Sequence, residues 1–127
     1  MTEAQLHRAV AAYLRLAIKP PAFFTTFPAG GGGKVRGGQL KAMGLLPGMP
    51  DLLVFWPIED DMGNPEPAVL GIELKTTKGS ISPQQKIVAK LFDGIGGDVA
   101  VCRSIDDVAK ALALWAVPLH ASVMGAT

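Results

Sequence analysis

Three charged side chains lie at the ends of two strongly apolar segments. Asp51 begins the run DLLVFW, while Glu73 and Lys75 stand near the end of AVLGIELK with one residue between them. Residues i and i+2 of a strand face the same side, so Glu73 and Lys75 should project together. If the two segments form a hairpin, the start of the first lies beside the end of the second. We therefore expect Asp51 and Glu73 to be neighbours although they are distant in sequence.

Two adjacent carboxylates repel each other unless a cation lies between them. A hard divalent ion such as Mg²⁺ or Mn²⁺ fits this need, since it takes carboxylate oxygens together with several waters. The Lys75 ammonium could then orient a water or stabilise charge that develops on a phosphate. The alternative is an exposed aspartate at a strand start and an ordinary surface pair of Glu73 and Lys75.

The remaining pattern predicts the elements that position these residues. Thr2 and Gln5 have capping-box spacing before an amphipathic helix, and Ser82 and Pro83 begin another. A helix between the last two strands makes that pair parallel. The expected elements are a helix over residues 3 to 18, strands over 23 to 27, 51 to 56, 68 to 75 and 98 to 103, and helices from 83 to 94 and from 105 to 115. Residues 28 to 38, which are rich in glycine, are expected to form a basic loop, residues 39 to 43 a short helical turn closed by Gly44, and residues 57 to 67 a turn-rich connection.

Composition bounds the class of protein. The 127 residues are 49% apolar, which is enough for one domain, expected to cover residues 1 to 127. The net charge of +1 means that any binding of a polyanion needs a local basic patch. A single cysteine, Cys102, excludes a disulfide framework and a thiolate-rich zinc site. Charges interrupt the first 20 residues and the longest apolar run is short, so we expect a cytoplasmic protein without a membrane partner.

Three short motifs stand in a recognisable order: Gly-Met-Pro-Asp at 48 to 51, Glu-Leu-Lys at 73 to 75, and Ser-Pro-Gln-Gln at 82 to 85. This arrangement resembles the PD-(D/E)XK nuclease superfamily and, more narrowly, its VRR-NUC (virus-type replication-repair nuclease) family. The resemblance implies an α/β, restriction-endonuclease-like fold with an αβββαβ core, a small mixed sheet flanked by helices. It also implies a DNA endonuclease dependent on Mg²⁺ or Mn²⁺. Asp51, Glu73 and the backbone carbonyl of Leu74 would bind the ion, and Lys75 would be the catalytic lysine.

Two further positions match the family pattern, and each has a structural alternative. Glu3 matches an acidic residue on the N-terminal helix and shares a face with Leu6 and Val10, but it could simply favour the helix dipole. Gln85 matches a helical glutamine near the metal, but it could instead hold the backbone amide of Ser82 in a capping box. We expect that one side chain does not easily do both.

Five basic residues flank these motifs and are candidates for DNA contact: Lys34, Arg36, Lys41, Lys78 and Lys86. Glycines around the first two would let backbone approach phosphates closely. The alternative for each is a solvated side chain.

The resemblance also bears on the biological role. Family members that stand alone are usually phage or prophage proteins that act as homodimers on branched DNA such as Holliday junctions, in the cytoplasm of the bacterial host. The apolar fraction of the chain and its apolar last helix, with Val108, Ala111, Leu112 and Trp115, permit a dimer. A flap- or nick-specific endonuclease, and a non-catalytic nucleic-acid-binding module on the same fold, remain the alternatives.

Overall fold

A four-stranded mixed sheet lies at the centre of the fold, in the order β1-β2-β3-β4. The computed structural model describes residues 1–27 and 33–120, with all their side chains except those at 33 and 34. β2 is antiparallel to both β1 and β3, and β4 is parallel to β3. The strands are β1 (Phe23–Thr26), β2 (Leu52–Glu59), β3 (Pro65–Leu74) and β4 (Asp98–Cys102).

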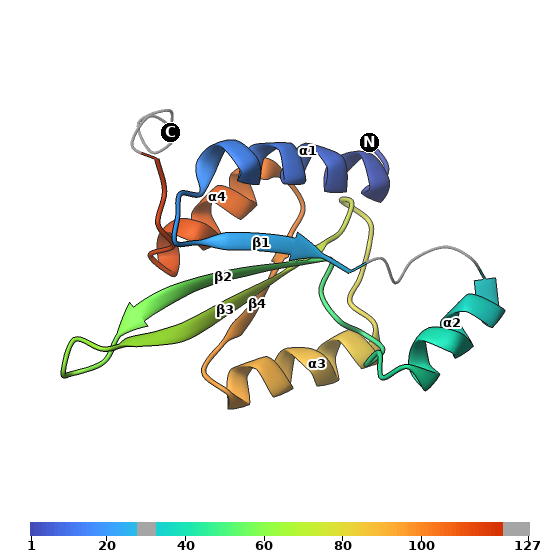
Figure 1. Ribbon diagram of the computed structural model, residues 1–127. Coiled ribbons are helices and arrows are strands. Elements are labelled where there is room, and N and C mark those ends of the chain that lie inside the picture. The colour runs from blue at the N-terminus through green and yellow to red at the C-terminus, as the bar shows by residue number, and fades with distance from the viewer. Residues whose placement is uncertain (28–32, 121–127) are drawn as a thin grey trace.

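Helices cover both faces of this sheet. Figure 1 shows α1 and α4 on one face and α3 on the other, with α2 projecting away from the sheet beyond the start of α3. The helices are α1 (Glu3–Ala17), α2 (Gly33–Ala42), α3 (Pro83–Gly94) and α4 (Ile105–Leu114). The order of elements confirms the expected αβββαβ core, and the predicted fold class is correct.

Alternation along the strands divides the core into two parts. Even-numbered residues of β2, such as Leu52 and Val54, pack toward α1 and α4, whereas Leu53 packs with Val88 and Phe92 of α3. Because successive strand residues face opposite sides, Asp51 and Glu73 both fall on the α3 side. Val108 and Leu112 of α4 are fully buried in the larger part. They are therefore core residues, and their apolar character is explained by packing inside the fold.

The capping motifs read from the sequence form as expected. Thr2 with Gln5 and Ser82 with Gln85 each make a complete capping box, and Ser104 caps α4. These bonds satisfy backbone N–H groups that have no partner inside the helix. They fix where α1 and α3 begin, which matters because both helix starts lie beside the candidate site.

Two predictions about connections are wrong. From residue 33 onward the basic segment is a helix and not a loop, because α2 covers Gly33–Ala42, while residues 28 to 32 of the predicted loop lie outside the described part of the chain. Low helix propensity of glycine motivated the loop, yet propensity is a weak guide that the surrounding chain can override. The prediction that Gly44 ends a helical segment here is correct: Gly44 has φ +106°, and Leu45 N donates to Leu40 O at 2.9 Å.

The hairpin connection is shorter than residues 57 to 67. β2 and β3 remain paired as far as Glu59 and Pro65. β1 pairs only as far as Phe55, so the prolines of this extension lie in a two-stranded ribbon with free edges, where a missing N–H is tolerated. The turn itself is closed by Asp60, whose Oδ1 accepts from the backbone N–H groups of Met62 and Asn64.

No helix within residues 1–27 and 33–120 is long and apolar enough to cross a membrane.

Candidate active site

Asp51 and Glu73 lie beside each other, as the hairpin predicts. Leu52 pairs with Ile72 in the register of β2 and β3, which brings the preceding residue Asp51 to the end of β3. The backbone N–H of Leu74 donates to Asp51 Oδ2 at 2.8 Å. The side chain of Asp51 is close enough to Glu73 that its negative charge and a side-chain hydrogen bond both raise the pKa of Glu73. The predicted proximity is therefore confirmed.

The loop before β2 is held in place by two close approaches that require glycine. Gly48 has φ +91°, and a Cβ there would lie 2.5 Å from the backbone of Gln84 in α3. Pro50 is fully buried, and a Cβ on Gly71 of β3 would lie 2.5 Å from its Cγ. The motif residues thus press the loop against α3 and β3. This packing places Asp51 at the strand start in one position.

Glu73 is a buried carboxyl with 4% exposure. Burial raises its pKa from an ordinary 4.5 to about 7, and the negative charge of Asp51 acts in the same direction. Lys75 opposes this pKa shift, and Glu3 adds a smaller unfavourable charge. The site thus holds more negative charge than its own cation offsets.

Lys75 lies against Glu73 at the same end of β3. Its Nζ is 3.7 Å from Glu73 Oε1, and its side chain is 12% exposed. The side chain also packs near the 76–79 turn, since a Cβ on Gly79 would be 3.2 Å from Lys75 Cδ. The stem is therefore enclosed while the ammonium faces the carboxylates.

Glu3 approaches the site from the first turn of α1. Its Oε1 would lie 3.4 Å from a Cβ on Gly79, and its charge contributes to the raised pKa of Glu73. Glu3 is exposed, unlike Leu6 and Val10, which share its helix face. The fold therefore brings Glu3 to the same end of the sheet without burying it.

Gln85 both caps α3 and contacts Glu73, although the sequence suggested that it would do only one of these. Its Oε1 accepts from the backbone N–H of Ser82 at 2.9 Å, and its Nε2 donates to Glu73 Oε1 at 2.7 Å. The expectation that one side chain does not easily do both is wrong, because the amide uses its two ends separately. The helix cap thereby becomes part of the site.

The donor set fits a divalent ion of the magnesium type. Residues 1–27 and 33–120 contain no group of three or more His, Cys, Asp or Glu side chains able to hold a metal. The site instead offers the carboxylates of Asp51 and Glu73 beside the Leu74 backbone. Mg²⁺ is usually bound by one or two carboxylates and keeps several waters, whereas structural zinc demands four protein ligands.

The candidate DNA-contacting residues are distributed around this end of the sheet. Lys78 follows β3 and Lys86 is on α3. Arg36 and Lys41 are on α2, which Figure 1 shows projecting away from the sheet beyond the start of α3. All four are exposed. The side chain of Lys34 lies outside the described part of the chain.

Thr26 and Arg103 also make contacts near the site, and no sequence motif predicts them. Arg103 Nη1 donates to the carbonyls of Thr76 and Gly79 at 2.6 and 2.8 Å, which ties the turn after Lys75 to the end of β4. Thr26 at the end of β1 donates to the backbone carbonyl of Asp51. Both join segments that are distant in sequence, so only the folded chain reveals them.

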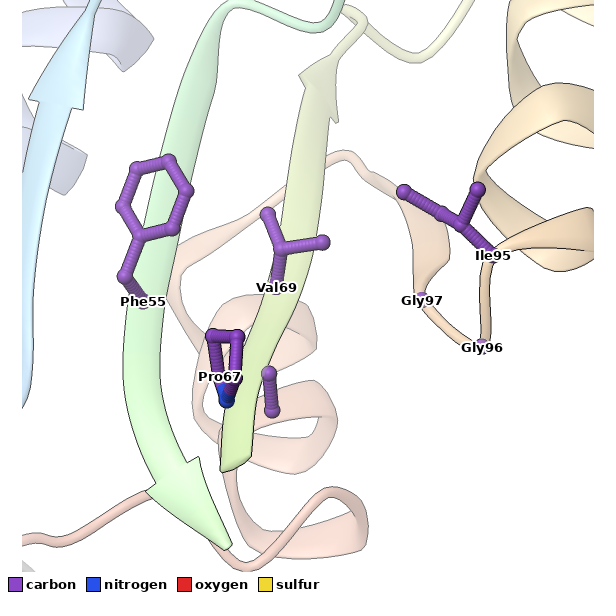
Figure 2. A pocket seen from close by; sticks show the side chains of 7 residues that line it. Phe55, Pro67, Val69, Ile95, Gly96 and Gly97 are labelled. Carbon is purple, nitrogen blue, oxygen red and sulfur yellow. The ribbon is translucent and has the colours of Figure 1, made fainter. Parts of the chain in front are cut away.

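An apolar cavity of about 290 Å³ lies elsewhere on the α3 side (Figure 2). Phe55, Val69 and Ile95 line it together with Pro67, Gly96 and Gly97. Phe55 is four residues along β2 from Asp51, toward the hairpin turn. None of the residues that line this cavity is ionisable, so it offers no group for hydrolysis.

This mixed sheet, with helices on both faces and a carboxylate pair at one end, defines a restriction-endonuclease-like fold. A model of the VRR-NUC domain matches residues 36–106, and the chain belongs to this family, which consists generally of nuclease domains.

A solved structure described as a "VRR_NUC domain protein" is similar in fold, with a TM-score of 0.67 and 20% sequence identity over 90% of this chain and 87% of that one. No curated protein matches the sequence.

Proposed function

We propose that this protein is a divalent-metal-dependent endonuclease that hydrolyses DNA phosphodiester bonds. The observation that supports this most directly is the buried carboxyl of Glu73 placed beside Asp51 and 3.7 Å from the Lys75 ammonium. Burying an ionisable group is costly unless it is paired, and perturbed carboxyls of this kind cluster at functional sites. A divalent cation would relieve the repulsion that a single lysine does not offset.

Asp51, Glu73 and the backbone carbonyl of Leu74 would hold Mg²⁺ or Mn²⁺. When bound, such an ion supplies Lewis-acid activation of water and of a phosphoryl oxygen. Other residues of the chain orient the two carboxylates. Gln85 Nε2 fixes the orientation of Glu73, and the Leu74 N–H fixes that of Asp51. Lys75 would orient the attacking water and stabilise negative charge that builds on the phosphate.

We propose branched DNA as the preferred substrate, with a Holliday junction as the leading case and a flap or nick as the alternative. Four exposed cations lie on α2, in the 76–79 turn and on α3, and we propose that they contact phosphates of more than one duplex arm: Arg36, Lys41, Lys78 and Lys86. The resemblance to junction-resolving family members supports the same substrate and an action in the bacterial cytoplasm on phage or prophage DNA.

We propose that the protein acts as a homodimer through the exposed side of α3. Ile87, Leu91 and Ile95 follow one another at a spacing of four residues and are 60%, 52% and 77% exposed. Exposed apolar side chains at this spacing are typical of a surface that another molecule covers. A two-fold pair could place two cuts symmetrically across a junction. Leu91→Glu should convert a dimer to a monomer in sedimentation analysis, whereas Lys90→Glu should not.

A cleavage assay tests the activity. Purified protein is incubated with labelled four-way junction, flap and linear duplex in Mg²⁺, Mn²⁺ or chelator, and binding is measured in parallel by anisotropy. We expect cleavage only with metal, and its loss in Asp51→Ala and Lys75→Ala while circular dichroism shows both folded. Lys90→Ala, an exposed lysine of α3, serves as the control. Binding of every DNA without turnover would favour the non-catalytic module. Cleavage at the wild-type rate by either site variant would remove that residue from the mechanism.

A further inference from the structure

We infer that Thr26, supported by His7, is a positioning residue for Asp51: its hydroxyl fixes the backbone of the residue that would bind the metal. This inference rests on the proposed function and extends it to two residues that no motif identifies. It begins from hydrogen bonds that connect α1, β1 and the start of β2.

The direction of these bonds follows from counting hydrogens. Thr26 Oγ1 lies 2.7 Å from the backbone oxygen of Asp51 and 3.1 Å from His7 Nε2. A carbonyl oxygen only accepts, so the single hydroxyl hydrogen of Thr26 goes to Asp51. His7 must then donate its Nε2–H to Thr26 Oγ1. The chain of donors runs from α1 through β1 to Asp51.

The position of Thr26 explains why a side chain is needed there. Thr26 is the last residue of β1 and pairs with Leu52, so the ladder between β1 and β2 ends one residue after Asp51. The Asp51 carbonyl lies just beyond that ladder, and the threonine hydroxyl takes the place of a backbone donor. On its other side, the carboxylate of Asp51 accepts from Leu74 N. Asp51 is thus held at its backbone by β1 and at its carboxylate by β3.

The same contacts contribute little to the core. Thr26 is an exposed residue of an edge strand, and His7 is half-buried. Both line an open cavity of about 330 Å³ between α1 and β1. Water in this cavity can replace the hydroxyl as a donor to the Asp51 carbonyl, but it cannot fix its direction. Removing the hydroxyl should therefore loosen Asp51 more than it destabilises the fold.

The neighbouring threonine provides a matched control. Thr25 is exposed on the same strand, and its hydroxyl lies 3.4 Å from the backbone oxygen of Thr26 without reaching Asp51. Valine keeps the β-branched shape in both positions, and serine keeps the hydroxyl. The comparison of Thr26→Val, Thr26→Ser and Thr25→Val isolates the bond to Asp51.

The experiment measures Mn²⁺ affinity without DNA, and kcat and KM for metal-dependent DNA cleavage. Losing a residue that orients a metal ligand typically costs about 10- to 100-fold in affinity or activity. We expect Thr26→Val to lose at least about tenfold in Mn²⁺ affinity and in kcat, with KM for DNA unchanged. Thr26→Ser and Thr25→Val should stay within twofold of wild type. His7→Gln, which retains a donor, should be less impaired than His7→Leu.

Wild-type values in Thr26→Val would overturn the inference, and so would an equal loss in Thr25→Val, because that loss would come from the strand in general. The Mn²⁺ measurement separates this result from a failure of the proposed function. If the wild type binds Mn²⁺ but cleaves no DNA, the endonuclease proposal fails, while the affinities of Thr26→Val and Thr26→Ser still decide whether Thr26 positions Asp51. A wild type that binds no Mn²⁺ contradicts both.

Discussion

Replacing Glu73 with glutamine should make the metal-free protein more stable at alkaline pH. Folding raises the pKa of Glu73 from 4.5 to about 7, so the folded state holds a proton that the unfolded state has released. The stability that this bound proton gives the wild type is fully present below pH 4.5 and is lost as the pH rises from 4.5 through about 7. A change of this size corresponds to about 3 kcal/mol. Glutamine has nearly the same shape, keeps an oxygen for Gln85 Nε2, and does not titrate.

Urea unfolding in chelator at pH 5 and pH 8 measures the effect. The advantage of Glu73→Gln over wild type should grow by about 2 to 3 kcal/mol between these pH values. Glu66→Gln is the control, because Glu66 is an exposed residue of the same strand and should follow the wild type. Mg²⁺ at about 100 times its Kd should stabilise the wild type at pH 8 by about 2.7 kcal/mol and leave Glu73→Gln unchanged. Parallel pH dependence of wild type and Glu73→Gln would refute the reasoning.

Further substitutions test the surroundings of the site and one candidate DNA contact. Ser82→Ala should cost about 1 kcal/mol of stability by removing a helix cap. Gln85→Ala should cost as much and should also weaken Mn²⁺ binding, because it removes the bond to Glu73. Equal Mn²⁺ affinities of Ser82→Ala and Gln85→Ala would contradict the second role of Gln85. Gly48→Ala should destabilise the protein by about 2 to 4 kcal/mol in urea unfolding, because the new Cβ meets the backbone of Gln84 and φ is positive. Gly63→Ala, where φ is +81° but the surrounding space is open, should cost about 1 kcal/mol. Similar losses in the two variants would show that the contact of Gly48 with α3 is unimportant. Lys41→Gln should reduce the slope of log affinity against log salt by about 0.9 if this lysine contacts a phosphate, and an unchanged slope would exclude that contact.

The part of the site that the sequence predicts is the part set by strand pairing. A hairpin between two apolar runs fixes that the start of one lies beside the end of the other, so Asp51 and Glu73 could be placed together before any coordinates were known. Helix caps at Thr2 and Ser82 were equally predictable, because each depends on residues only three apart. Local rules of this kind do not depend on the rest of the chain.

The remaining features depend on distances between elements. That Gln85 reaches Glu73 while capping α3 is decided by where α3 docks on the sheet, and no spacing in the sequence encodes it. The bond from Thr26 to Asp51 depends on where the ladder between β1 and β2 ends. The helix α2 was not predicted, because glycine has low helix propensity. Propensity alone does not determine whether a segment of this length forms a helix.

Mn²⁺ binding followed by electron paramagnetic resonance at pH 8 tests the central claim most directly, because free and protein-bound Mn²⁺ differ in signal. We expect the wild type to remove free Mn²⁺ from solution, Asp51→Asn and Glu73→Gln each to lose this binding, and the exposed-site variant Glu66→Gln to retain it. Equal Mn²⁺ binding by all four proteins would contradict the account, because the ion would then be held by other groups.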